Sequence, residues 1–220
     1  MPVALITGAT RGLGREVARA LTARGWRVVL DARTFAGDVD GDLVVGDVTD
    51  PAHRAELTAA VRRHGRLDLL VNNASTLGPG IRPLRHYPLD ELRRVLEVDV
   101  LAPLALVQDL LPILEASAGA VINVSSDAAV EAYEGWGGYG AAKAALDHLT
   151  AVLAVEQPAV RCYALDPGDM RTDLHQQAFP GEDISDRPEP ATVVPAVLRL
   201  VDERPGSGRY RAADLLRVGT

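Results

Sequence analysis

The chain has 220 residues, of which 47% are hydrophobic and 24% charged, and its formal net charge at pH 7 is −7. This length and composition are typical of a soluble globular protein, so we expect one domain over residues 1–220. The negative charge argues against nucleic acid or an anionic membrane surface as a partner, and no apolar run approaches the roughly 20 residues of a membrane span.

The N-terminal segment combines an apolar run, a glycine-rich turn and a helical pattern. Residues 3–6 read as a buried parallel strand, followed by Thr7-Gly-Ala-Thr-Arg-Gly-Leu-Gly14 and a helix over 15–24 that Gly25 ends. Such a turn lets the backbone approach a pyrophosphate, whose charge the helix N-terminus favours. Because the spacing is Gly-x-x-x-Gly-x-Gly and not the commoner Gly-x-Gly-x-x-Gly, an ordinary glycine-rich turn is the alternative for this segment alone.

Further strands and helices alternate along the chain without a linker or an internal repeat. Strands are predicted at 27–30, 43–45, 67–71, 120–124, 160–165 and 210–213. Helices are predicted from Pro51 to about His64 with Asp50 as the cap, from 89 to about 114, from 138 to about 156, and over 195–201. Repeated strand–helix units predict a doubly wound parallel sheet in a three-layer α/β/α fold, whose ligands bind at the carboxyl ends of the strands.

Ser126, Tyr139 and Lys143 form the pattern that bears most directly on chemistry. Four-residue spacing on the predicted helix places Tyr139 and Lys143 on one face, one turn apart. A lysine cation about 5 Å from a phenol favours the phenolate by roughly 3 kcal/mol at an effective dielectric of about 20. We therefore expect Lys143 to bring the pKa of Tyr139 near the working pH, and the Ser126 hydroxyl to donate a hydrogen bond to a carbonyl oxygen.

Six short motifs occur in the order in which one protein family carries them. They are the turn at 7–14, Asp47-Val48, Asn72-Asn73-Ala74, Ser126, Tyr139-x-x-x-Lys143, and Pro167-Gly168 with Thr172. On these motifs the chain resembles the short-chain dehydrogenase/reductase family, in its compact single-domain branch, over nearly its whole length. The resemblance implies a Rossmann-type fold and an oxidoreductase that transfers a hydride between a nicotinamide cofactor and a carbonyl or secondary alcohol.

The resemblance also implies a role for each matched residue. Ser126 would bind the substrate oxygen, Tyr139 would act as general acid/base, and Lys143 would lower the tyrosine pKa and bind the nicotinamide ribose. A homodimer or homotetramer is implied, formed by the helix predicted at 89–114 and the helix that carries Tyr139. The residues that it places at the cofactor are Gly8, Thr10, Arg11, Gly12, Leu13, Gly14, Arg33, Asp47, Val48, Asn73, Ala74, Tyr139, Lys143, Pro167, Gly168, Met170 and Thr172. For the segment 72–74, support of the strand is an equal alternative to cofactor contact.

The end of the second predicted strand bears on the choice of cofactor. Matched to the family's pattern, the selecting position is Ala32, not Asp31, and Arg33 follows it. Arg11 and Arg33 would then bring two guanidiniums to the adenosine ribose, where arginine suits a 2′-phosphate. This predicts a preference for NADP(H). The alternative is a solvated Arg33, with Asp31 binding the ribose 2′-hydroxyl of NAD(H).

Two residues depart from the family pattern. Ser75 follows Asn72-Asn73-Ala74 where the family usually has glycine, and Asp99 stands at the site of an asparagine whose backbone carbonyl holds a relay water near the lysine. Aspartate is compatible with that role of the carbonyl, but an ionised side chain cannot replace an amide that donates a hydrogen bond. Its charge would raise the pKa values of Lys143 and Tyr139, so we expect activity with a pH profile for oxidation that is displaced upward.

The substrate site is expected between residues 128–136 and a loop at about 169–190 that is rich in charge and proline. Tyr133 and Trp136 either wall an apolar pocket or lie at a subunit contact. The substrate is an unspecified ketone, aldehyde or matching secondary alcohol. Two other functions are open: a regulator that binds NADP(H) without turnover, and a sugar-nucleotide epimerase or dehydratase of the related extended branch, which needs a larger C-terminal region than follows Pro167.

Cysteine and histidine usage completes the sequence-based expectations. Cys162 is the only cysteine, so an internal disulfide is excluded, and we expect it to be buried on a core strand. The five histidines show no metal-ligand spacing, so we predict no metal site and expect them at the surface. The first predicted strand starts at Val3 and leaves no room for a signal peptide. A cytoplasmic location follows from these features.

Overall fold

The computed structural model describes residues 1–34 and 40–217, so the domain predicted over 1–220 includes residues outside the described ranges. The described residues build a seven-stranded sheet in the order β3-β2-β1-β4-β5-β6-β7, with every neighbouring pair parallel. The order reverses between β1 and β4, where open α/β sheets bind their ligands. The strands are β1 (Val3–Ile6), β2 (Arg27–Ala32), β3 (Asp42–Val45), β4 (Leu69–Asn72), β5 (Ala120–Val124), β6 (Arg161–Asp166) and β7 (Gly208–Arg211).

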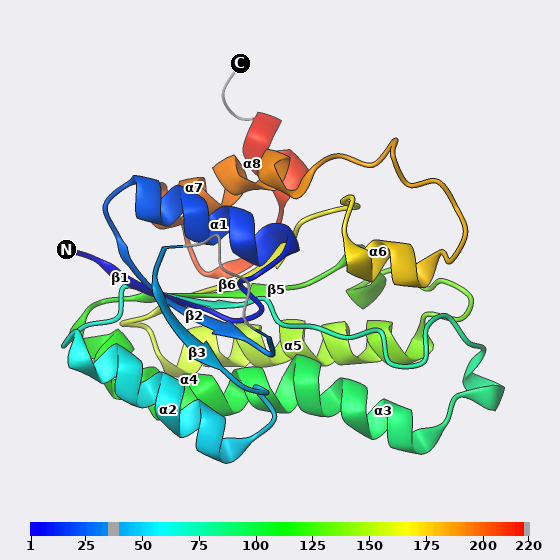
Figure 1. Cartoon of the computed structure of the whole chain (residues 1–220), viewed down its shortest axis with the longest axis horizontal. Coiled ribbons are helices and arrows are strands. Elements are labelled where there is room, and N and C mark those ends of the chain that lie inside the picture. The colour runs from blue at the N-terminus through cyan, green and yellow to red at the C-terminus, as the bar shows by residue number, and fades with distance from the viewer. Residues whose placement is uncertain (35–39, 218–220) are drawn as a thin grey trace.

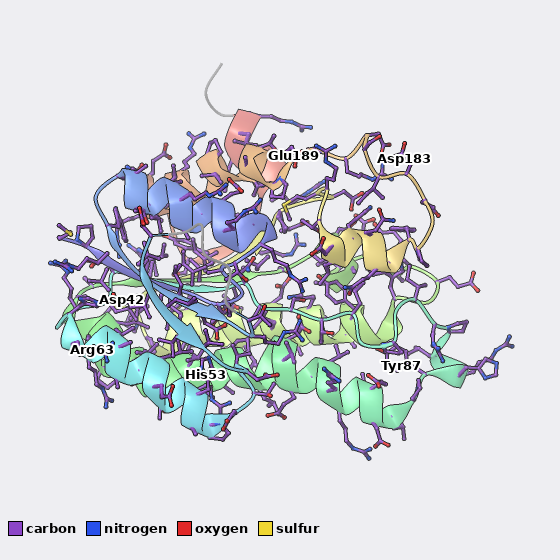
Figure 2. The ribbon with its side chains drawn as sticks, viewed as in Figure 1. Asp42, His53, Arg63, Tyr87, Asp183 and Glu189 are labelled. Carbon is purple, nitrogen blue, oxygen red and sulfur yellow. The ribbon has the colours of Figure 1, made fainter. Side chains whose placement is uncertain are left out.

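Helices cover both faces of the sheet (Figure 1). One face carries α1 (Gly12–Ala23), α7 (Val194–Glu203) and α8 (Ala212–Arg217), and the other carries α2 (Pro51–Arg63), α4 (Ala102–Ala116) and α5 (Gly137–Glu156). Successive strand residues point to opposite faces, so Ile6 packs in the core beneath α1 and α7, and Leu5 packs in the core beneath α2 and α4. Side chains fill the space on both sides of the sheet (Figure 2). The predicted doubly wound, three-layer α/β/α architecture is confirmed.

Most predicted elements are found with small shifts at their ends. The first and fifth strands have the predicted bounds, and Asp50 caps α2 by accepting a hydrogen bond from the Ala52 N–H at 2.9 Å. Gly25 follows α1 with a φ of +79°, as a C-terminal glycine should. The first helix begins at Gly12, inside the glycine turn, and the predicted last strand ends at Arg211 because the next residues form α8.

The single helix predicted over 89–114 is wrong. The segment is instead α3 (Leu89–Leu96), a π-helical turn η2 (Glu97–Leu101) and α4. Pro103 has no N–H, so it cannot donate the α-helical bond that would reach the carbonyl of Asp99. The Ala102 N–H donates instead to the Glu97 carbonyl, five residues back. Asp99 therefore lies in a widened turn, a feature that often marks functional sites, and it is 1% exposed.

Other features of the fold also differ from expectation. The loop predicted at about 169–190 contains α6 (Asp173–Ala178), which lies near the strand ends and apart from both helical layers (Figure 1). His53 and His175 are buried, so the expectation of surface histidines is wrong for these two. Cys162 is buried on β6 as predicted.

Within the two described ranges, every helix is too short or too polar to cross a membrane. Short turns of 3₁₀ helix complete the chain at η1 (Leu84–His86), η3 (Asp127–Ala129) and η4 (Pro190–Val193).

Candidate active site

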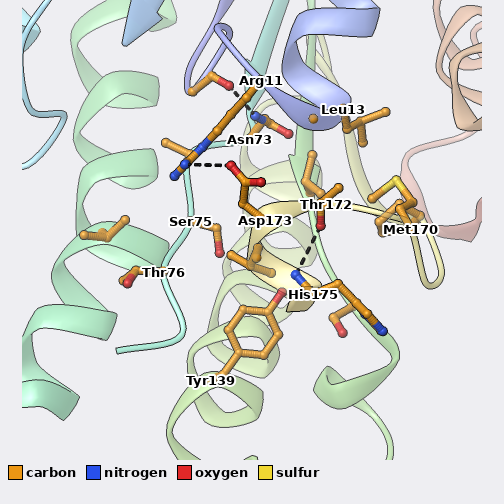
Figure 3. Close-up of a pocket in the computed structure, with 18 of the residues that line it drawn as sticks. Arg11, Leu13, Asn73, Ser75, Thr76, Tyr139, Met170, Thr172, Asp173 and His175 are labelled. Atoms are coloured by element: carbon orange, nitrogen blue, oxygen red, sulfur yellow. Dashed lines mark hydrogen bonds and ion pairs between the residues drawn. The ribbon is translucent and has the colours of Figure 1, made fainter. Parts of the chain in front are cut away.

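A cleft of about 830 Å³ opens at the carboxyl ends of the strands, within the usual size range of ligand sites. It brings together the β1–α1 turn, the segments after β2 to β6, the start of α5 and α6 (Figure 3). The predicted site residues that line it are Gly8, Thr10, Arg11, Gly12, Leu13, Arg33, Asp47, Val48, Asn73, Ala74, Ser126, Tyr133, Trp136, Tyr139, Lys143, Pro167, Gly168, Met170 and Thr172. Gly14 and Asp99 lie behind this lining.

The glycine turn needs its glycines for backbone conformation and for space. Gly8 and Gly12 have φ values of +62° and +53°, in the left-handed region that other residues avoid. A Cβ atom on Gly14 would lie 2.5 Å from the Asn73 side-chain nitrogen and 2.6 Å from the Gly8 oxygen. The Asn73 amide donates to the carbonyls of Thr7 and Gly8 at 2.9 and 3.1 Å. Its side chain therefore braces the turn, in line with the strand-support interpretation of this segment.

The N-terminus of α1 offers free donors to the cleft. This helix has 12 residues, and its N-cap residue Arg11 makes no side-chain capping bond. The N–H groups of its first turn therefore have no side-chain acceptor, while Gly12 and Leu13 line the cleft. Uncapped N–H groups together with the helix dipole favour an anion. This end of the cleft fits the pyrophosphate of a nicotinamide dinucleotide.

Asp31, at the end of β2, uses both carboxylate oxygens inside the protein. Oδ1 lies 2.6 Å from His53 Nε2, and Oδ2 accepts the Gly8 N–H at 3.1 Å. Burial raises the pKa of Asp31, against the lowering effect of the His53 and Gly8 hydrogen bonds. His53 has room only because position 46 is glycine, since a Cβ there would lie 2.2 Å from the imidazole. Asp31 is therefore a buried brace of the glycine turn.

Two arginines line the cleft near this strand end. Arg33 is close to Asp47, whose pKa is lowered because Thr49 hydrogen bonds and the Arg33 charge outweigh the opposing effect of burial. Arg11 forms an ion pair with Asp173 of α6 at 3.0 Å (Figure 3). The Arg11 and Asp173 side chains are 57% and 66% exposed, so this pair contributes at most about 1 kcal/mol. Arg11 is therefore held only weakly in this position.

Tyr139 and Lys143 are buried on the first turns of α5. The Lys143 Nζ atom lies 5.4 Å from the centroid of the Tyr139 ring and donates to the Val124 carbonyl at 2.9 Å. Gly140 lets α5 approach η3 closely, since a Cβ there would lie 2.7 Å from the Ala128 oxygen. This approach brings Ser126, at the start of η3, into the same part of the cleft. The Ser126 hydroxyl donates to the carboxylate of the next residue at 2.9 Å.

Asp99 pairs directly with Lys143. The Asp99 Oδ1 atom lies 3.0 Å from Lys143 Nζ, and the two side chains are 0% and 3% exposed. The same oxygen accepts the Ser75 hydroxyl at 2.5 Å, and Oδ2 accepts the Thr76 N–H at 3.2 Å. The sequence identified Asp99 and Ser75 separately, and the structure brings them into contact.

The electrostatic environment of Tyr139 differs in part from expectation. Burial raises the pKa of Tyr139, and the lowering effects of Lys143 and of hydrogen bonding with Ser75 and Ser126 do not outweigh it. The prediction that Lys143 brings the phenol near the working pH is therefore wrong for this structure. Burial lowers the pKa of Lys143, but the Asp99 charge outweighs burial and the net pKa is raised. Asp99 raises both pKa values, the direction that the sequence predicts.

Aromatic side chains form one wall of the cleft beside Tyr139. The Trp136 ring lies 5.8 Å from Tyr139 and 6.0 Å from Phe179, measured between centroids. Leu174 and His175 of α6 also line this part of the cleft. Sequence reasoning missed Phe179 and the two α6 residues, although Thr172 is a recognisable cap, whose hydroxyl accepts the His175 N–H at 3.2 Å.

Tyr133 lies at the rim, not in the wall, of the cleft. It is 42% exposed, and its hydroxyl lies 3.0 Å from an Asp127 oxygen and 2.8 Å from a Glu131 oxygen. These hydrogen bonds raise the pKa of Tyr133.

Over residues 1–34 and 40–217 no histidine, cysteine, aspartate or glutamate side chains gather into a metal-binding group.

Comparisons with known proteins agree with this geometry. The family model described as short chain dehydrogenase matches residues 2–183. The uncharacterized oxidoreductase YIR035C of Saccharomyces cerevisiae is 34% identical over 183 residues, which cover 78% of this chain and 72% of the relative. The benzil reductase ((S)-benzoin forming) of the same yeast is 32% identical over 194 residues, covering 79% and 73%. The alcohol dehydrogenase of Thermococcus sibiricus, solved with 5-hydroxy-NADP, superposes with a TM-score of 0.85 at 26% identity, covering 96% of this chain and 95% of that one.

Proposed function

The chain belongs to the short chain dehydrogenase family of oxidoreductases, which act on CH–OH and C=O groups, and on that premise we propose that it is an NADP(H)-dependent carbonyl reductase. Tyr139 is its general acid/base, Ser126 binds the substrate oxygen, and Lys143 with Asp99 sets the charge around the phenol. The observation that carries the proposal is the buried Tyr139–Lys143 pair, which lies in the same cleft as the uncapped N-terminus of α1.

The proposed mechanism divides the work between the cofactor and the chain. NADPH, when bound, supplies the hydride. The N–H groups of Gly12 and Leu13 would hold its pyrophosphate, and Lys143 would bind its nicotinamide ribose. The Ser126 hydroxyl turns from Asp127 to donate a hydrogen bond to the substrate carbonyl oxygen. Tyr139 passes its proton to that oxygen, and the Lys143 cation stabilises the phenolate that remains. Oxidation of an alcohol follows the same steps in reverse.

A preference for NADP(H) rests on the end of β2. Both oxygens of Asp31 already accept hydrogen bonds from Gly8 and His53, and its side chain is only 3% exposed, which disfavours it as the partner of a ribose hydroxyl. Arg33, which follows β2, and Arg11 of the glycine turn both line the cleft, and their guanidiniums suit a 2′-phosphate. The structural relative from Thermococcus sibiricus, which carries a derivative of NADP, supports the same choice.

We propose an aromatic or otherwise flat ketone as the substrate. The Trp136 and Phe179 rings form an apolar wall, tilted 49° to each other with centroids 6.0 Å apart, and Trp136 meets Tyr139 edge-on. A flat ring packed against this wall would keep its carbonyl next to the Tyr139 hydroxyl. The benzil reductase of yeast, which shares 32% identity with this chain, makes diaryl ketones the first compounds to test.

The remaining proposals concern assembly and location. We propose one domain over residues 1–220 and a cytoplasmic homodimer or homotetramer. Exposed apolar side chains on the two helical segments implied as subunit contacts support the assembly, since Leu101 is 49%, Val152 38% and Val155 83% exposed. Light scattering coupled to size-exclusion chromatography measures the state directly.

A carbonyl panel tests the function. NADPH and NADH oxidation are followed with benzil, an aryl methyl ketone, an aliphatic ketone and an aldehyde, with cofactor binding measured separately by fluorescence. Tyr139→Phe should lose at least about a hundredfold in turnover and keep its NADPH affinity. Tyr210→Phe, on β7, is the matched control and should keep both. Tight NADPH binding without turnover of any carbonyl would point instead to the regulator alternative.

A further inference from the structure

Ser75 and Asp99, which the sequence singles out separately, touch each other. The Ser75 hydroxyl donates to Asp99 Oδ1 at 2.5 Å. A distance this short is typical of a hydroxyl bonded to a carboxylate. The Asp99 side chain is fully buried, so this hydroxyl is one of its few partners.

Local structure on both sides fixes this contact. The N–H groups of Asn73 and Ala74 donate to the Thr7 hydroxyl at 2.9 and 3.0 Å, which anchors the chain just ahead of Ser75. Gly78 then turns the chain back with a φ of +64°, and a Cβ there would lie 2.7 Å from a Val95 methyl of α3. On the other side, the π-helical turn presents Asp99 to this segment. Ser75 is therefore held in place from both directions.

Ser75 also interacts with the phenol of Tyr139. Both residues line the same part of the cleft (Figure 3), and Ser75 lowers the pKa of Tyr139 when its hydroxyl donates a hydrogen bond to the phenol oxygen. A serine hydroxyl has one proton to donate and two lone pairs that accept. While that proton is given to Asp99, Ser75 can only accept a hydrogen bond from the Tyr139 hydroxyl. A phenolate has no proton to give, so it can bind Ser75 only if the serine proton turns towards it.

We propose that Ser75 is a further catalytic residue, whose hydroxyl proton turns from the Asp99 carboxylate to the Tyr139 phenolate when Tyr139 has given up its proton. The proposal rests on the proposed role of Tyr139. In reduction the phenol O–H bond breaks and its proton forms the alcohol O–H bond of the product, while the Ser75 O–H bond stays intact and only rotates. Asp99 keeps Lys143 Nζ and the Thr76 N–H as partners, so the carboxylate is not left unpaired.

This hydrogen bond aids catalysis because it strengthens only as the proton leaves Tyr139. Interactions that are stronger in the transition state than in the ground state raise kcat. Hydrogen bonds to charged groups are commonly worth about tenfold to a hundredfold in an equilibrium. Other charged or titratable side chains surround Tyr139 and Lys143, and none of them is substituted in the Ser75 variants. They are Lys143 and Asp147 of α5, Asp99 of η2, Tyr87 ahead of α3, Asp127 of η3 and His175 of α6.

The experiment compares Ser75→Ala, Ser75→Thr and the control Ser117→Ala in the full chain. Ser117 follows α4, outside the lining of the cleft, and its hydroxyl accepts the Leu67 N–H at 3.1 Å. The measurements are kcat and KM for the best ketone of the panel, NADPH affinity by fluorescence, and the ionisation of Tyr139 by NMR of ring-labelled tyrosine, assigned with Tyr139→Phe. Ser75→Ala should lower kcat about tenfold to a hundredfold, with KM and NADPH affinity unchanged, and Tyr139 should ionise at higher pH. Ser75→Thr, which keeps the hydroxyl, should restore both quantities, and Ser117→Ala should match the wild type in kcat and in the ionisation of Tyr139.

Each contrary result has a distinct meaning. Ser75→Ala with wild-type kcat and wild-type ionisation of Tyr139 overturns the role of Ser75 and leaves the proposed function standing, provided that Tyr139→Phe is inactive. Equal losses in Ser75→Ala and Ser75→Thr also overturn it, because the hydroxyl is then not what matters. Wild-type turnover by Tyr139→Phe overturns the proposed function and the role of Ser75 together. The NMR titration needs neither cofactor nor substrate.

Discussion

Replacing Asp99 by asparagine tests the ion pair beneath the site. Lys143 Nζ and Asp99 Oδ1 are 3.0 Å apart, and both side chains are almost fully buried. At that distance and an effective dielectric of about 20, the Coulomb attraction is roughly 5–6 kcal/mol, much of which offsets the cost of burying the two charges. Removing one partner of a buried pair costs about 3–5 kcal/mol. The asparagine oxygen still accepts from Lys143, so we expect a loss of about 3 kcal/mol, or roughly 6–12 °C in Tm.

The pH dependence of this loss has a definite sign. The folded-state pKa of Lys143 is raised above its ordinary value of 10.5. A group with a raised folded pKa contributes stability that is fully present below its unfolded pKa and is lost as the pH rises through the folded value. The difference between wild type and Asp99→Asn is therefore constant around neutral pH and narrows only above about pH 10. For activity, Asp99 raises the pKa of Tyr139, so the substitution moves the pH profile of alcohol oxidation downward.

Urea unfolding at neutral pH and initial rates of alcohol oxidation across pH measure the two effects. Asp90→Asn is the matched control, because it removes the same charge from an ion pair with Arg93 whose side chains are 95% and 71% exposed. That pair should contribute no more than about 0.5 kcal/mol. Equal unfolding of the two variants, together with an unchanged oxidation profile for Asp99→Asn, would refute the reasoning.

Three further predictions concern the cleft. Arg33→Ala should weaken NADPH binding about tenfold and leave NADH binding nearly unchanged, as measured by cofactor fluorescence; equal losses would contradict the proposed 2′-phosphate contact. Asp173→Asn releases Arg11 from its ion pair and should raise NADPH affinity by up to about fivefold, whereas a lower affinity would show that the pair supports the site. Trp136→Ala should raise KM for an aryl ketone several-fold more than KM for an aliphatic one, and a uniform increase would argue against an aromatic wall.

Much of the fold could be predicted because its signals are local. The apolar run at Val3–Ile6, the glycines of the turn after it and the capping residue Asp50 each act through residues a few positions away. The π-helical turn at Asp99 could not be predicted in the same way. Pro103 predicts an irregular helix, but it does not specify the irregularity, because a kink, a break and a π-helical turn are all compatible with one proline.

The candidate site shows the same division. Tyr139 and Lys143 could be paired from their spacing, since one helical turn fixes it. The contacts that set their chemistry join residues far apart in sequence, as Ser75 and Asp99 do, and depend on how α3, η2 and α5 pack. The sequence-based prediction for the pKa of Tyr139 counts the lowering effect of the Lys143 charge but not the raising effect of burial. Burial is a tertiary property, and in the structure it has the larger effect.

The charges around Tyr139 bear on the direction of the proposed reaction. Burial and Asp99 raise the pKa of the phenol, and the Lys143 cation that opposes them is already paired with a carboxylate. At neutral pH the phenol therefore keeps its proton, the form that reduction of a carbonyl requires, whereas oxidation of an alcohol requires the phenolate. Turnover in the oxidative direction should need alkaline pH, while reduction should proceed at neutral pH. If oxidation reached its maximal rate at neutral pH, the Lys143 cation would have to outweigh burial.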